Sequence, residues 1–115
     1  MTRTILIVDD HPPFREAARQ LLESEGFAVV GEAADGASAV HQAQELEPEI
    51  ILLDVHLPDF DGFEVARRVE AFRRPPIVIL TSSREDYASL VEGSAAHAFV
   101  LKDQLSGETL AAALM

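Results

Sequence analysis

Short apolar stretches recur along the chain and are separated by longer segments of mixed polarity. Five of them, at 4–8, 27–33, 50–53, 77–80 and 98–101, are rich in aliphatic residues. Apolar runs of this length without polar alternation indicate strands that are buried on both faces, as in a parallel sheet. The pattern therefore predicts five strands.

In the intervening segments apolar residues recur at intervals of three and four, which indicates helices that each bury one face. The predicted buried faces are Phe14, Ala17, Ala18, Leu21 and Leu22; Ala39, Val40, Ala43 and Leu46; Phe63, Ala66, Val69 and Phe72; and, in a weaker helix over about 84–92, Tyr87, Leu90 and Val91.

Several residues mark where these helices begin and end. Pro12-Pro13 suits a first helical turn, because the N–H groups that proline lacks would be unpaired there. Gly26 is predicted to follow the C-cap of the first helix. Ser106 is the predicted N-cap of a last helix, with Leu105 and Leu110 packed across its start. The sequence stops barely two turns later, so this helix is expected to be truncated.

Strands that alternate with helices predict an α/β fold, doubly wound around a parallel sheet. Right-handed crossovers would place helices on both faces of that sheet. A chain of 115 residues has the size of one domain, to which we assign residues 1–115.

Polar residues follow four of the predicted strands. Asp9 and Asp10 follow the first strand, Asp54 the third, Thr81 the fourth and Lys102 the fifth. The carboxyl ends of parallel strands share one edge of the sheet, which is where ligands bind in open α/β folds. The sequence therefore predicts one acidic site with a single lysine.

Such a site needs positive charge, because each close pair of carboxylates costs about 4 kcal/mol at an effective dielectric of about 20. Lys102 supplies one charge, and an all-oxygen site with room for water suits Mg²⁺ better than zinc. A cation there would screen an incoming phosphoryl group, so that one of the aspartates can attack phosphorus. Thr81 and Lys102 could then hold phosphoryl oxygens.

Taken one at a time, these residues have simpler explanations. Paired aspartates can cap a helix, Asp54 can form a turn, and Thr81 can cap the next helix. Lys102 alone is an ordinary solvated lysine, and Phe99 alone is a core residue. The four histidines share no ligand spacing and are expected at the surface: His11, His41, His56 and His97. Only the combination at one sheet edge favours a site.

Charge and composition exclude several classes of function. Nine basic and 20 acidic residues give a net charge of −11, so the domain is expected to repel nucleic acid and anionic membranes. The lack of cysteine excludes disulfides, thiolate metal sites and cysteine nucleophiles, and it suits the cytoplasm, where we expect the protein. The five-residue apolar run after Arg3 is too short for a signal peptide or a membrane span.

The ordered motifs resemble the receiver domain of two-component response regulators. They are Asp9-Asp10, the loop Asp54-x-x-Leu57-Pro58-x-x-x-Gly62, Thr81, and Phe99-x-x-Lys102. The resemblance covers nearly the whole chain and implies a CheY-like, flavodoxin-like sheet of order 2-1-3-4-5. The run Ile5-Leu-Ile-Val-Asp-Asp-His-Pro-x-Phe-Arg is similar to the NarL-type subfamily, whose members usually carry a C-terminal helix-turn-helix for DNA.

The resemblance implies a role for each matching residue. Asp54 would be the phosphoacceptor and would take its phosphoryl group from a sensor histidine kinase. Asp10, Asp54 and the backbone carbonyl of His56 would bind Mg²⁺, with Asp9 acting mainly through water. Lys102 would pair with phosphoryl oxygens, and Thr81 would move toward them.

The resemblance also implies a switch and its partners. Phe99 would turn inward together with Thr81, and the surface of the helix over 84–92, the strand over 98–101 and the last helix would change shape. That surface would bind a partner or form a homodimer. A receiver is not an enzyme, and this one would contact DNA only through an output domain that would lie beyond residue 115. The protein would thus be a phosphoprotein that acts in phosphorelay signal transduction and in the regulation of transcription.

The chain departs from the family pattern before the predicted switch residue Phe99. Ala95 and Ala98 stand where the family often has glycine, so this segment is expected to be stiffer or different.

Two rival functions compete with that of a phosphoacceptor. A phosphatase of the haloacid-dehalogenase kind would need a second aspartate two residues after the nucleophile, where this chain has His56. The alternative of a phosphorylation-silent interaction module conflicts with the cost of keeping repulsive carboxylates together without a ligand.

Overall fold

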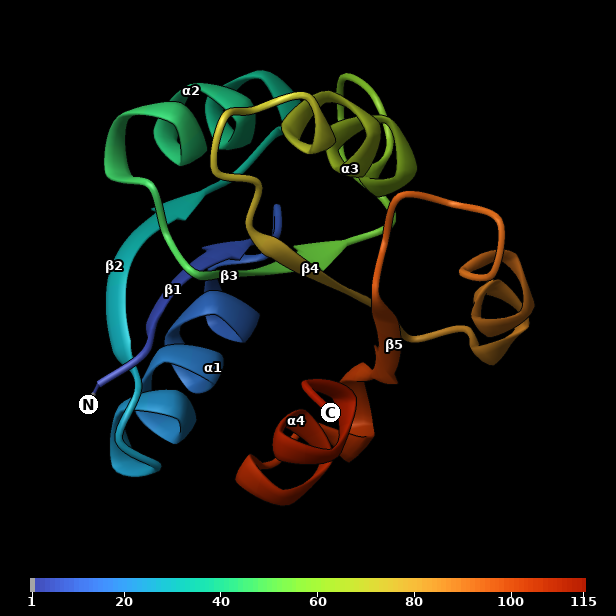
Figure 1. Cartoon of the computed structure of the whole chain (residues 1–115). Coiled ribbons are helices and arrows are strands. Elements are labelled where there is room, and N and C mark those ends of the chain that lie inside the picture. Colours follow the sequence, from blue (N-terminus) through green and yellow to red (C-terminus); the bar gives the residue numbers. More distant parts are fainter. Residues whose placement is uncertain (1) are drawn as a thin grey trace.

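The computed structural model describes residues 2–115, which form one five-stranded sheet with helices on both sides (Figure 1). The strand order is β2-β1-β3-β4-β5, and every neighbouring pair is parallel. The strands are β1 Thr4–Val8, β2 Ala28–Ala33, β3 Ile50–Asp54, β4 Ile77–Ser82 and β5 Ala98–Leu101. This arrangement confirms the predicted fold, strand order included.

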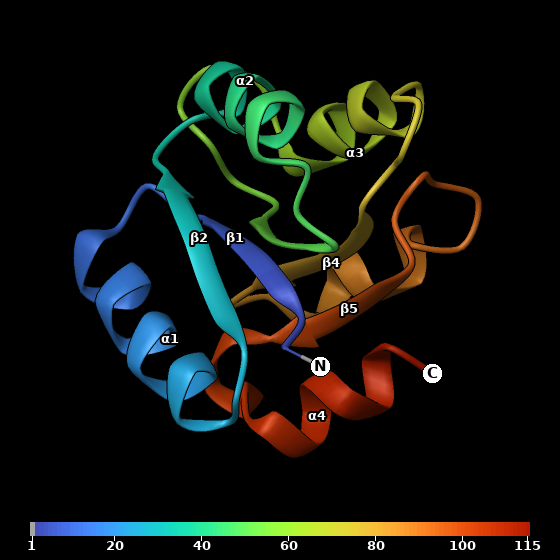
Figure 2. The same cartoon turned by 60° about the vertical axis from the view of Figure 1, so that its left-hand side comes forward.

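Two helices cover each face of the sheet. Helices α2 Gly36–Leu46 and α3 Gly62–Glu70 lie on one face, and α1 Pro12–Ser24 and α4 Gly107–Ala113 lie on the other (Figures 1 and 2). None of the helices within residues 2–115 is both long and apolar enough to cross a membrane.

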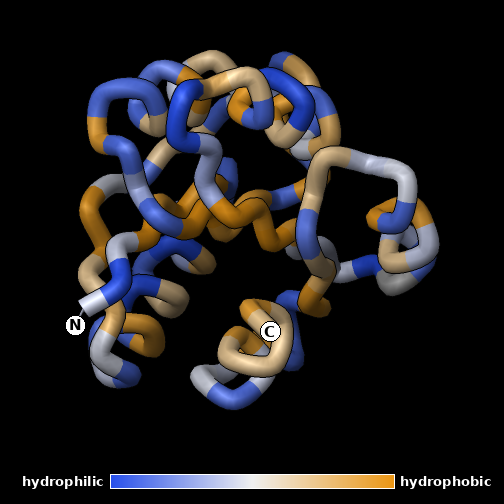
Figure 3. Tube along the Cα trace, viewed as in Figure 1, coloured by the Kyte–Doolittle hydropathy of each residue, from blue (hydrophilic) through white to orange (hydrophobic). Residues whose placement is uncertain are grey.

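The sheet residues are buried on both faces, because successive side chains of a strand point to opposite sides. In β3, Ile51 and Leu53 pack toward α2 and α3, whereas Ile50 and Leu52 pack toward α1 and α4. All four are at most 1% exposed. The central strands accordingly form the most hydrophobic part of the chain (Figure 3). This two-sided burial is the reason for the unalternated apolar runs.

The residues predicted to mark the ends of α1 and the start of α4 are confirmed. Pro12-Pro13 occupies the first two positions of α1, and Gly26 follows its C-cap with φ 92°. Ser106 caps α4 by accepting a hydrogen bond from the Thr109 amide at 3.0 Å. Leu105 and Leu110 pack in the same core cluster, and α4 has only seven residues.

The sequence predictions are wrong for one helix and for the burial of three side chains. The helix predicted over 84–92 is only a 3₁₀ helix, Glu85–Leu90, and the side chain of Leu90 is 54% exposed. Too few apolar side chains reach the core here to offset the cost of nucleating an α-helix. Ala17 and Leu46 are also exposed. In α3, by contrast, Val65 is fully buried although the sequence did not indicate it.

Candidate functional site

The carboxyl ends of β1, β3 and β5 bring two aspartates and a lysine into direct contact. Lys102 Nζ lies 2.6 Å from Asp9 Oδ2 and 3.2 Å from Asp54 Oδ2. Asp9 is 0% and Asp54 3% exposed, and the Lys102 side chain is 19% exposed. These groups are 48 residues or more from Lys102 along the chain and meet only because the strands are parallel.

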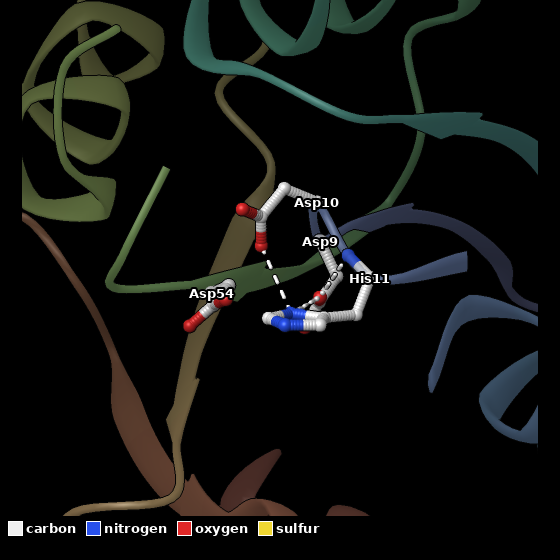
Figure 4. A group of neighbouring side chains, drawn as sticks. All are labelled: Asp9, Asp10, His11 and Asp54. Atoms are coloured by element: carbon white, nitrogen blue, oxygen red, sulfur yellow. Dashed lines mark hydrogen bonds and ion pairs between the residues drawn. The ribbon is translucent and has the colours of Figure 1, made fainter. Parts of the chain in front are cut away.

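Asp10 and His11 complete the cluster on its solvent side. One side-chain ligand atom each of Asp9, Asp10, His11 and Asp54 lies within 4.8 Å of the other three. Figure 4 shows the three residues that follow β1 facing Asp54 at the end of β3. His11 Nδ1 is 3.1 Å from Asp10 Oδ1, and its side chain is 71% exposed. The sequence placed His11 at the surface, as found, but gave it no place in the ligand set.

Thr81, the second-to-last residue of β4, lies next to this cluster. It is the register partner of Asp54 across the β3–β4 ladder and is 1% exposed. Its hydroxyl oxygen has no hydrogen-bond partner within the described residues 2–115. A buried hydroxyl without a partner costs about 1–3 kcal/mol. Such an atom beside a carboxylate cluster fits a site that holds an oxygen-rich ligand.

The electrostatics of the site are dominated by two buried carboxylates that share one ammonium group. Burial, followed by the negative charge of Asp9, raises the pKa of Asp54, although Lys102 and the His56 amide oppose this. Burial would lower the pKa of Lys102, but its hydrogen bond to Asp9 and the charge of Asp54 outweigh that effect and raise it. Lys102 therefore stays charged, and the cluster keeps an excess of negative charge.

The donor set suits a hard divalent cation. Three carboxylates offer oxygen ligands, and the exposed positions of Asp10 and His11 leave one side open to water. Carboxylate oxygens with several retained waters are the typical environment of Mg²⁺ in proteins. The residues present therefore fit this ion.

Two further predicted residues lie at different distances from the cluster. The His56 amide donates a hydrogen bond to Asp54 Oδ1 at 3.2 Å, so the loop after β3 begins at the site. Phe99, in β5, packs against the core on the α2–α3 side and also lines a cavity of about 710 Å³ between β5 and α4. It belongs to this neighbouring surface and not to the ligand set.

The structure also reveals supporting residues that the sequence did not indicate. The ammonium group of Lys102 lies 4.7 Å from the centre of the Phe14 ring, an arrangement that favours the charged form. Arg15 donates a hydrogen bond to the backbone carbonyl of Asp9 at 2.6 Å and pairs with Glu32 at 3.1 Å. Helix α1 therefore holds both Lys102 and Asp9 in place. The only sequence signal for these contacts is that Phe14 and Arg15 follow closely after the paired aspartates.

Comparison with known proteins gives relatives along the whole chain. The transcriptional regulatory protein YdfI of Bacillus subtilis is 41% identical over 109 residues, which are 92% of this chain and 50% of that protein. The positive transcription regulator BvgA of Bordetella pertussis is 36% identical over 115 residues, 98% of this chain and 55% of its own. The chain thus spans about half the length of the curated relatives it matches.

Solved structures of similar proteins share the fold. A LuxR-family two-component response regulator from Aurantimonas superposes with a TM-score of 0.87 at 31% identity, covering 99% of this chain and 83% of that one. CheY in a CheX-CheY-BeF3-Mg complex from Borrelia burgdorferi superposes with a TM-score of 0.81 at 28% identity. The match covers 98% of this chain and 87% of that one. The family model described as the response regulator receiver domain matches residues 5–114. This chain therefore belongs to the family of response regulator receiver domains.

Proposed function

We propose that residues 1–115 are the phosphoacceptor domain of a two-component system and that Asp54 accepts the phosphoryl group from a sensor histidine kinase. The observation that carries this proposal is the pairing of buried Asp54 with Lys102, beside the Thr81 hydroxyl, which has no hydrogen-bond partner among residues 2–115. A nucleophile, a fixed cation and a free hydrogen-bond donor are the groups that phosphoryl transfer to a carboxylate needs.

In this reaction a carboxylate oxygen of Asp54 forms a bond to phosphorus while the bond from phosphorus to the donor's nitrogen breaks. The electron pair of the broken bond leaves with the imidazole of the kinase, and Asp54 becomes an acyl phosphate. Lys102 pairs with one phosphoryl oxygen, and Thr81 donates its hydroxyl proton to another in a hydrogen bond.

Asp10, Asp54 and the His56 carbonyl would hold Mg²⁺, with Asp9 acting mainly through water. When bound, the ion would neutralise charge on the carboxylates and on the phosphoryl oxygens. Support comes from the donor set and from the Borrelia burgdorferi relative, whose structure is named as a complex with BeF3 and Mg²⁺. The exposed Asp10 leaves the ion accessible from solvent.

The proposed output follows from the surface next to the site. Phosphorylation would draw Thr81 toward the phosphate and Phe99 inward, and would so reshape the surface formed by the 3₁₀ helix Glu85–Leu90, β5 and α4. That surface would bind a second receiver or another partner. The likeness to LuxR-family and other transcription regulators supports a NarL-type protein that acts in the cytoplasm through a DNA-binding domain. The domain itself would turn over no substrate.

The proposal is tested by incubation with Mg²⁺ and acetyl phosphate, followed by intact-mass measurement. The wild type is expected to gain one phosphoryl group that is labile in base, and EDTA should prevent the gain. Asp54→Asn should gain none, while Asp86→Asn, which changes an exposed aspartate, should behave as wild type. A wild type that gains no mass would instead be a silent interaction module, and rapid release of phosphate from many donors would indicate a phosphatase.

A further inference from the structure

The loop between β3 and α3 is tied to a helix far from it in sequence by one carboxylate. Asp59 accepts hydrogen bonds from the amides of Gly36 at 2.7 Å and Ala37 at 2.9 Å, the first two residues of α2. It also accepts one from its neighbour Phe60 at 2.9 Å. Desolvation opposes ionisation, but the bonds from Ala37, Gly36 and Phe60 outweigh it and lower the pKa of Asp59. The clamp therefore exists in its charged form at neutral pH.

The N-cap residue of α2 does not bind the amides of Gly36 and Ala37. Asp35, the N-cap, accepts a hydrogen bond from the Ser38 amide at 2.7 Å. The amides of Gly36 and Ala37 lie before that position and are among the four that no helical carbonyl can satisfy. Asp59 supplies their acceptors from 22 and 23 residues away. Helix α2 thus has two separate caps, one local and one belonging to the loop.

Packing of the next residue strengthens the same contact. A side chain at Gly36 would bring its Cβ to within 2.5–2.9 Å of three ring carbons of Phe60, so the ring lies directly against the helix start. The guanidinium of Arg68 covers the Phe60 ring at 4.0 Å from its centre. The second half of the loop is therefore fixed by a hydrogen-bonded and a packed contact to α2.

The first half of the loop is fixed by the sheet. The Val55 amide donates to the carbonyl of Thr81 at 2.9 Å, and the Gly62 amide donates to the carbonyl of Val55 at 2.8 Å. His56 therefore lies between an anchor on β4 and the Asp59 clamp on α2. The direction of its backbone carbonyl depends on both ends of this short span.

We propose that Asp59 is a positioning residue, which clamps the loop to α2 and so aims the His56 carbonyl at the divalent cation. The inference rests on the proposed function, because that function makes this carbonyl a ligand. Without the clamp, binding the ion would also have to order the loop, and the affinity would fall. Outer partners that orient metal ligands typically account for about 10–100-fold in metal affinity.

Asp59→Ala and Asp35→Ala form a matched pair for the test. Each removes one carboxylate cap from the start of α2, but only the first releases the loop. The Mg²⁺ dissociation constant is measured by NMR titration of the amide signals, and Tm is measured without metal. We expect Tm to fall in both variants, Mg²⁺ affinity to fall about tenfold in Asp59→Ala alone, and Asp59→Asn, which keeps one acceptor oxygen, to recover part of it.

Each outcome of these measurements supports or overturns the positioning role of Asp59. Unchanged Mg²⁺ affinity in Asp59→Ala, or an equal loss in Asp35→Ala, would overturn the positioning role and leave the proposed function standing. If Asp59→Ala did not fold, Asp59→Asn would replace it, and wild-type affinity in that variant together with a lowered Tm would overturn the role. A wild type that does not bind Mg²⁺ at all would overturn the proposed function together with this inference.

Discussion

Replacing Asp54 with asparagine is expected to stabilise the metal-free protein. The folded state raises the pKa of Asp54 through burial and the nearby charge of Asp9, so it disfavours the ionised carboxylate. A carboxyl group of this kind imposes no penalty below its unfolded pKa, near 3.8. The penalty grows as the pH rises from the unfolded pKa toward the higher folded pKa, and it is constant above the folded pKa. Above the folded pKa the penalty is complete, and replacing the carboxylate with a neutral amide removes it.

The size of the effect follows from the distances in the site. Asp54 lies within 4.8 Å of Asp9 and Asp10 oxygens, and each such pair repels by about 3.5 kcal/mol at an effective dielectric of about 20. Attraction between Asp54 Oδ2 and Lys102 Nζ, 3.2 Å apart, offsets about 5 kcal/mol of this repulsion at the same dielectric. Burial of a carboxylate adds several kcal/mol of cost, and solvent screens the exposed Asp10.

We therefore expect a net gain of about 1–3 kcal/mol for Asp54→Asn. An unfolding entropy of about 2.1 cal/mol/K per residue converts this gain to a rise in Tm of about 4–12 °C. The assay is thermal unfolding in EDTA, with Asp86→Asn as a control that should stay within about 0.5 kcal/mol of wild type. Saturating Mg²⁺ should narrow the difference, since it stabilises the wild type more. An Asp54→Asn variant that is equally or less stable in EDTA would refute the reasoning.

Three further predictions concern other parts of the structure. Lys102→Met should lower stability by about 3–5 kcal/mol in EDTA, because it leaves buried carboxylates uncompensated, and Mg²⁺ should restore part of the loss; the measurement is urea unfolding. Glu32→Gln should be less stable than wild type at neutral pH, because hydrogen bonds from Arg19, at 2.7 Å, and Arg15, both in α1, lower the pKa of Glu32. The difference in urea midpoint should vanish as the pH falls below 4.5 through the folded pKa. His97→Ala should lose about 1–3 kcal/mol, since Nδ1 of His97 accepts the hydrogen bond of the buried Val78 amide at 3.1 Å, while His97→Asn should lose less; equal losses in thermal unfolding would contradict this account.

The fold could be predicted because its signals are local. A strand that is covered on both faces must be apolar at every position, so Ile50–Asp54 is visible as an unbroken run that ends in a carboxylate. The site could be predicted for the same reason, because parallel strands place the residues after them at one edge. Asp9, Asp54 and Lys102 meet there, as the strand ends required.

Contacts between distant segments could not be predicted from these signals. Nothing near Asp59 indicates that it caps a helix that begins 23 residues earlier, and nothing near Phe14 indicates that its ring lies beside the Lys102 ammonium. The prediction of marginally stable helices fails for a related reason. The segment Glu85–Leu90 has helical spacing, but its conformation depends on how much of it the core can cover, which the local sequence does not determine.

The role of Asp54 is tested most directly by locating the phosphoryl group on the chain. Phosphorylation with acetyl phosphate and Mg²⁺, followed by borohydride reduction, converts an acyl phosphate on aspartate to homoserine, and peptide mass spectrometry then identifies the position. We predict homoserine at residue 54 in the wild type and none in a sample treated with EDTA. Homoserine at another aspartate, or at none, would contradict the assignment of this cluster as the phosphorylation site.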